Sequence, residues 1–135
     1  MTTYFESNKS IVSQFISGWG TTTDVSYDNV EFDLKGRTDE WVRISVTPIL
    51  SAQTSLGKKG DRKYQRNGLI NIQVFTPLGE NTGLAVVLSQ QALEIFEGES
   101  FDGVTCNNGD ITTIGRNEGW YQTNVSIDYN FIERK

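Results

Sequence analysis

The chain contains no histidine and a single cysteine, Cys106, among its 135 residues. Histidine is the commonest general base near neutral pH and the commonest metal ligand in proteins. Its absence excludes serine–histidine and cysteine–histidine catalytic pairs, as well as zinc sites built from cysteine and histidine. A lone cysteine also cannot form an internal disulfide, which excludes a disulfide-stapled secreted domain.

Long hydrophobic runs are absent too, since no apolar stretch approaches the roughly 20 residues needed to span a bilayer. The N-terminus lacks a basic segment followed by an apolar one, so we expect no signal peptide and no membrane association. The composition, 36% hydrophobic and 21% charged, is that of a globular protein. We therefore expect one soluble domain over residues 1–135, in a reducing compartment.

Basic residues are fewer than acidic ones, 12 against 17, and the net charge of -5 disfavours a dedicated nucleic-acid-binding protein. The basic residues are concentrated in residues 57–68, where five of them and one acidic residue give a net charge of +4. The rest of the chain has seven basic and 16 acidic residues, a net charge of -9. This pattern is consistent with a basic loop that docks on an acidic protein rim or a phosphate backbone. The alternative is a solvated loop tip. The candidate docking residues are Lys58, Lys59, Arg62, Lys63 and Arg66.

Apolar periodicity predicts two amphipathic helices. Residues 3–18 carry apolar side chains at three- and four-residue steps, and Thr3 stands three residues before a glutamate, the spacing of a capping box. Residues 82–97 carry a second apolar stripe. This helix is expected to begin after a polar cap at residues 81–82 and to end before Gly98.

Alternating apolar residues predict strands around these helices. The order of elements is typical of an α+β fold, with a mostly antiparallel sheet, both helices packed on one face and a polar opposite face. Pro48 indicates a sheet edge or a bulge. The expected strands are 25–32, 41–50, 69–76, 103–106, 110–115 and 120–131, with a turn at 34–40 and an extended basic hairpin loop at 57–68.

The remaining chemical candidates are weak. The acidic cluster after the second helix does not match a calcium-binding loop, and we interpret it as a solvated helix end rather than a cation site. Cys106 has Asp102 and Asp110 as its nearest charges in sequence, which would raise its pKa, so we expect a buried, inert thiol. We predict no enzymatic activity, no cofactor and no metal. The acidic cluster consists of Glu94, Glu97, Glu99 and Asp102.

Several segments in order along the chain resemble the tail terminator family of long-tailed phages, the lambda-type tail completion proteins. An amphipathic N-terminal helix comes first, and the resemblance spans nearly the whole chain. The segments that carry it are Trp41-Val42-Arg43-Ile44, Ser55-Leu56-Gly57, Arg66-Asn67-Gly68, Val74-Phe75-Thr76-Pro77 and Gly119-Trp120-Tyr121-Gln122.

This resemblance implies a structural virion protein of the tail and neck, assembled in the host cytoplasm, that forms a ring, typically hexameric. The ring would cap the tail tube, stop its polymerisation and join the tail to a head-side connector or head-closure protein. DNA would pass through its bore without specific binding, and the basic loop would dock on the tail tube or a neighbouring subunit. The alternatives are another neck component, such as a head-closure or connector protein, and a small-molecule-binding or enzymatic α+β domain that uses the acidic cluster.

Overall fold

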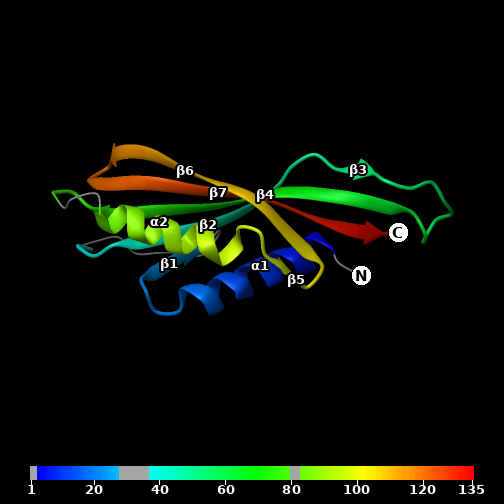
Figure 1. The fold of residues 1–135 in the computed structure, drawn as a ribbon, viewed down its shortest axis with the longest axis horizontal. Coiled ribbons are helices and arrows are strands. Elements are labelled where there is room, and N and C mark those ends of the chain that lie inside the picture. The colour runs from blue at the N-terminus through cyan, green and yellow to red at the C-terminus, as the bar shows by residue number, and fades with distance from the viewer. Residues whose placement is uncertain (1–2, 28–36, 80–82) are drawn as a thin grey trace.

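The computed structural model describes residues 3–27, 37–79 and 83–135 and shows a curled sheet with two helices on one face (Figure 1). The predicted α+β architecture is confirmed. The elements, in chain order, are α1 (Tyr4–Trp19), β1 (Asp24–Tyr27), β2 (Trp41–Pro48), β3 (Ala52–Gln53), β4 (Lys63–Pro77), α2 (Gly83–Phe96), β5 (Ser100–Phe101), β6 (Val104–Asn117) and β7 (Trp120–Arg134).

The sheet has the strand order β1-β2-β4-β7-β6-β5, and the short β3 pairs with β4. All neighbouring strands are antiparallel except β1 and β2. The central pair, β4 and β7, is in register from Lys63 opposite Arg134 to Pro77 opposite Trp120. Each of these strands has 15 residues, about 50 Å at 3.4 Å per residue. The end of this pair that contains the start of β4 and the end of β7 therefore extends beyond the helices (Figure 1).

Helix α1 forms as its sequence predicts. The Thr3 hydroxyl accepts a hydrogen bond from the Glu6 backbone N–H at 3.2 Å, which caps the helix. Ile11, Phe15 and Trp19 recur at four-residue steps and are buried against α2 and the sheet. Burial of each such side chain contributes about 1.5–3 kcal/mol to folding.

Helix α2 covers the same face of the sheet and completes the core. Its buried residues include Leu88, Ala92 and Phe96, and the Phe96 ring stacks on Phe15 of α1 with centroids 6.2 Å apart. This confirms that both helices pack on one face. The cap predicted at residues 81–82 lies outside the described residues, as do residues 28–36, which include the start of the predicted turn at 34–40 and most of the predicted strand 25–32.

The helix-free face of the sheet is polar in the middle of β4, as predicted, but near the end of β4 the buried Trp41 and Phe75 stack on this face with ring centroids 4.2 Å apart. In β4, buried Ile70, Ile72 and Val74 alternate with the half-buried Asn71 and Gln73. The Asn71 side-chain oxygen accepts a hydrogen bond from the hydroxyl of Ser126 on β7 at 2.9 Å. Polar side chains of this face therefore bond to one another across strands, while the main apolar core lies on the helix side.

The extended basic hairpin loop predicted at 57–68 is not confirmed in that form. Strand β4 already begins at Lys63, and the connection from β3 spans residues 54–62. Residues 63–68 form a strand because β7 continues to Arg134 and pairs with each of them. No helix lies over this part of the sheet, so the sequence there lacks the apolar alternation that predicts a strand.

The predicted strands 103–106 and 110–115 form one strand, β6. Shifts of register between Cys106 and Gly109 and between Thr113 and Gly115 interrupt its pairing with β7. Such bulges break the period-two pattern from which strands are predicted, and this explains why the sequence indicated two strands.

A close contact between Gly68 and Tyr129 lies where the helix-covered part of the sheet ends. The two residues are cross-strand partners, and a Cβ on Gly68 would overlap the Tyr129 ring. Tyr129 is 1% exposed and packs against Tyr4 and Phe131 in the core. Only glycine therefore leaves room for this ring in its observed position.

We predict that Gly68→Ala lowers the free energy of unfolding by about 1–3 kcal/mol, because the Tyr129 ring must move in a close-packed region. Urea unfolding followed by tryptophan fluorescence measures this change. Gly57→Ala is the matched control, since the nearest atom to its new Cβ is 3.4 Å away, and its effect should stay within about 0.5 kcal/mol. Equal stability of the two variants would contradict the packing argument.

Candidate functional site

The far end of the β4–β7 pair forms a projection that we call the basic arm, residues 54–66 and 131–135. The backbone groups of Arg62 and Lys135 exchange two hydrogen bonds, of 3.2 and 2.8 Å. The N–H of Thr54 donates to the carbonyl of Lys63 at 2.8 Å. These bonds hold the connection 54–62 against both long strands, so the arm is an extension of the sheet (Figure 1).

The arm gathers more positive charge than the sequence indicated, because β7 brings Arg134 and Lys135 beside the predicted cluster. Its seven basic and two acidic side chains give a net charge of +5. The remaining five basic and 15 acidic residues give the rest of the chain a net charge of -10. The predicted final strand stopped at residue 131. The apolar alternation ends at Phe131, because Ile132 falls on the other face and Glu133 follows it, so pairing with β4 rather than a local pattern extends this strand.

The predicted docking residues have different surroundings. Lys58, Lys59 and Lys63 are exposed, whereas Arg62 is half-buried. Arg66 is paired within the arm, as its Nε lies 2.9 Å from a carboxylate oxygen of Glu133.

The Arg66–Glu133 pair is shielded, with both side chains 15% exposed, and the Arg66 guanidinium lies 4.9 Å from the centre of the Tyr64 ring. Arg66 therefore holds β4 to β7 rather than presenting a free charge. The pair between Arg134 and Asp61, at 3.4 Å, is exposed on both sides and contributes little to stability.

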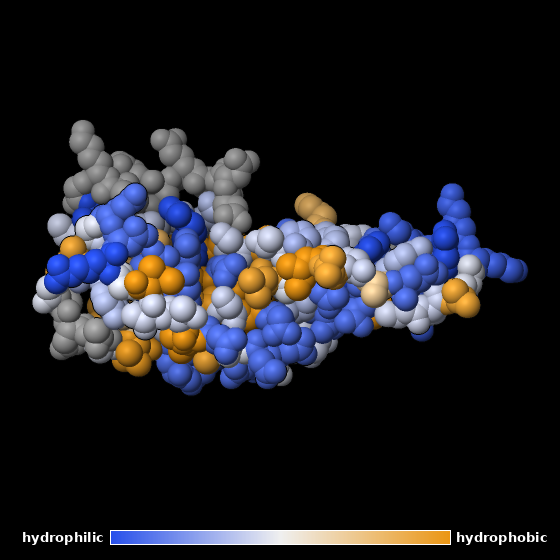
Figure 2. Space-filling view, turned by 90° about the horizontal axis from the view of Figure 1, so that it is seen from above, coloured by the Kyte–Doolittle hydropathy of each residue, from blue (hydrophilic) through white to orange (hydrophobic). Residues whose placement is uncertain are grey.

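Apolar side chains are exposed among these charges. Leu56 is 95% exposed, Leu50 beside the arm is 88% exposed, and Ile132 is 46% exposed. Figure 2 shows hydrophobic atoms on the otherwise hydrophilic narrow end of the molecule. Exposed apolar residues rimmed by charge are typical of surfaces that contact another protein.

The predicted acidic cluster does not form a convergent site. The Glu97 carboxylate accepts a hydrogen bond from the backbone N–H of Gly109 at 2.9 Å, and thus ties the end of α2 to β6. The Glu94 carboxylate accepts one from the Gln90 side chain at 3.0 Å. Within residues 3–27, 37–79 and 83–135, no three acidic or cysteine side chains lie close enough together to hold a metal ion.

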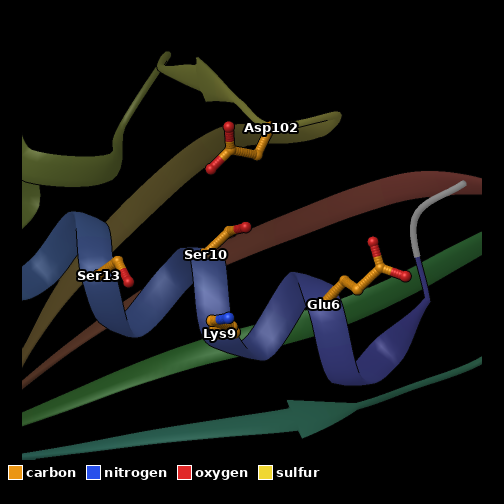
Figure 3. A pocket seen from close by; sticks show the side chains of 5 residues that line it. All are labelled: Glu6, Lys9, Ser10, Ser13 and Asp102. Carbon is orange, nitrogen blue, oxygen red and sulfur yellow. The ribbon is translucent and has the colours of Figure 1, made fainter.

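Asp102 of the same cluster lies at the β5–β6 turn, across an open hollow of about 330 Å³ from α1. The side chains that line it spread along two turns of α1 and do not converge on one point (Figure 3). A shallow hollow of this kind lacks the apolar walls of a typical small-molecule site. The residues that line it are Glu6, Lys9, Ser10, Ser13 and Asp102.

Cys106 is buried, 2% exposed, on the helix side of the sheet. Burial, together with the negative charges of Asp128 and Glu99, raises the pKa of its thiol to about 12. The charges that act on it are therefore not the sequence neighbours that we expected, Asp102 and Asp110. Strand pairing and the β5 turn bring Asp128 and Glu99 closer.

We predict that Cys106 resists thiol reagents in the folded protein. A pKa of about 12 instead of 9.0 leaves roughly 1,000-fold less thiolate at pH 8, and burial slows access further. Reaction with DTNB at pH 8 should therefore be at least about 100-fold slower in buffer than in 8 M urea. Equal rates would show that this part of the core opens readily.

Comparisons with known proteins bear on the fold. No protein-family model and no curated protein matches the chain. Neither helix in the described part of the chain is long and apolar enough to cross a membrane. Among solved structures 16 chains match. One of these, a protein whose name states no activity, has a TM-score of 0.65 and 17% sequence identity over 92% of this chain and 94% of that chain. At this identity the likeness shows a shared α+β fold.

Proposed function

We propose that this chain is a ring-forming tail terminator, a structural virion protein that caps the tail tube and joins it to the head-side connector. The observation that carries the proposal is the separation of charge, with a net +5 on a projecting arm and a net -10 on the rest of the chain. Opposite charges at different places on one subunit favour head-to-tail contacts between copies. Such heterologous contacts generate a closed ring when the rotation between copies closes.

The proposed role needs surfaces rather than catalysis. The arm presents exposed lysines and an exposed leucine to a neighbouring protein, and electrostatic complementarity of this kind steers association. An acidic body would disfavour adhesion of phosphate groups, so DNA would pass through the bore without specific binding. The order of sequence segments that resembles tail terminators gives the same assignment.

The arm is the place to test this function. The reversal Lys58→Glu, Lys59→Glu, Arg62→Glu should leave the fold intact but abolish attachment to purified tail tubes, because it replaces the three cations of the connection 54–62 with acids. Co-sedimentation with tail tubes measures attachment, and circular dichroism checks the fold. Arg66 is left unchanged because it pairs with Glu133.

Lys9→Glu is the control, since it reverses an exposed charge on α1, away from the arm. It should attach to tail tubes as the wild-type protein does. Wild-type attachment of the triple variant would contradict the docking role of the arm. Binding of the wild-type protein to portal-side complexes, with no binding to tail tubes, would instead assign it to the head-closure or connector proteins.

A further inference from the structure

The outer edge of β6 is open over half its length. β5 pairs only with Val104 and Thr105, and backbone bonds from the α2–β5 connection reach no further than Asn107. In the described part of the chain, no strand pairs with the outer side of β6 between Asp110 and Asn117. An unpaired edge exposes a row of backbone donors and acceptors and is a template for pairing with another chain.

Side chains around this edge are both apolar and acidic. Ile111 and Ile114 on β6 are 41% and 49% exposed. Asp110 is exposed on the other face of the same edge, since it pairs with Ser126, whereas Ile111 pairs with the buried Val125. The strand contributes a single basic side chain here, Arg116.

Helix α2 continues the surface that begins at β6. Leu93 lies against the backbone of Gly109, where a Cβ would overlap it, and Glu97 binds the N–H of the same glycine. The side of α2 that contains these residues therefore runs along β6. Val86, seven residues before Leu93, lies on this side and is 62% exposed, and the exposed Glu94 follows Leu93.

We define the β6 edge surface as Val86, Glu94, Asp110, Ile111, Ile114 and the open edge from Asp110 to Asn117. The basic arm matches it in three respects. Its cations are opposite in charge to Glu94 and Asp110. Its exposed Leu56 and Ile132 supply apolar contacts. The outer edge of β7 after Asn130 has no strand beside it within the described residues.

The arm and the β6 edge surface lie far apart on one subunit. In Figure 1 the arm projects at one end of the long axis, whereas the β6–β7 turn lies at the opposite end. A subunit therefore cannot cover its own β6 edge with its own arm. A second copy can, and the contact repeats from copy to copy because each subunit keeps one arm and one edge free.

We propose that the basic arm of one copy docks along the β6 edge surface of the next copy. This inference rests on the proposed ring and names the two surfaces that build it. Charge complementarity identifies a second copy of this chain as the occupant, since the arm's net +5 faces a body of net -10. The contact is heterologous, which is the type that closes into a ring.

A charge-swap experiment tests the pairing. Variant A carries Lys58→Glu, Lys59→Glu and Arg62→Glu on the arm, and variant B carries Glu94→Lys and Asp110→Lys on the β6 edge surface. In each variant alone the arm and the edge have like charge, so we expect both to stay monomeric. In an equimolar mixture each arm meets an edge of opposite charge. Light scattering and native mass spectrometry should then show an oligomer of wild-type size with equal numbers of A and B.

A double variant elsewhere on the surface serves as the matched control for variant B. Asp39→Lys with Asp128→Lys reverses two exposed acids outside the β6 edge surface. Asp128 lies on β7, where its carboxylate accepts a hydrogen bond from the Asn107 side chain. This control should assemble like the wild-type protein. Urea unfolding of A, B and the control confirms that each variant is folded before association is compared.

The outcomes separate this inference from the proposed function. Assembly of variant B alone, or a mixture of A and B that stays monomeric while the wild-type protein assembles, overturns the pairing of arm and edge but leaves the proposed ring untouched.

If the wild-type protein is monomeric alone, the same variants are compared for attachment to tail tubes. Recovery of attachment by the mixture supports the pairing, and full attachment of B alone overturns it. A wild-type protein that neither assembles nor attaches overturns both proposals.

Discussion

The pairing of β4 with β7 is the constraint on which the rest of the structure depends. These two strands are the longest in the sheet and stay in register over all 15 residues. The half of the pair near Val74 carries the hydrophobic core with α1 and α2. The other half has no helix over it and becomes the arm. A change of register by one residue would exchange the apolar and polar faces of both halves at once.

The boundary between the two halves is held by a few close contacts. The Tyr129 ring covers Gly68, and the Tyr4 ring meets Phe131 edge-on with centroids 5.1 Å apart. The Tyr4 hydroxyl also donates to the carbonyl of Asn67 at 3.2 Å. The start of α1 therefore anchors the base of the arm to the core. This fixes the direction in which the arm projects, and an element held in a fixed direction loses less conformational entropy if it binds a partner.

The same architecture places the basic arm at one end of the molecule and the open edge of β6 away from it. Beyond the core, the strands have no apolar partner layer, so their side chains are free to be charged without a cost of burial. Arg66 and Glu133 form the one shielded ion pair of the arm, while the lysines at its tip stay in solvent. On the body, β6 extends beyond the reach of β5 and leaves an edge with exposed isoleucines. A single chain therefore carries a basic arm and, apart from it, an open strand edge.

The sequence by itself determined both helices, the α+β class and the side of the sheet that holds the core, because each depends on local periodicity. The four-residue spacing of Phe15 and Trp19 predicts the buried face of α1, and the two-residue spacing of Ile70 and Ile72 predicts the buried face of β4. Neither spacing depends on distant residues. Tertiary structure alone decided where the strands end. Lys63 and Arg66 lie in a strand because Arg134 and Phe131, about 70 residues away, pair with them. The full charge of the arm, the pairing of Arg66 with Glu133 and the charges near Cys106 follow from the same long-range pairing, which no local pattern encodes.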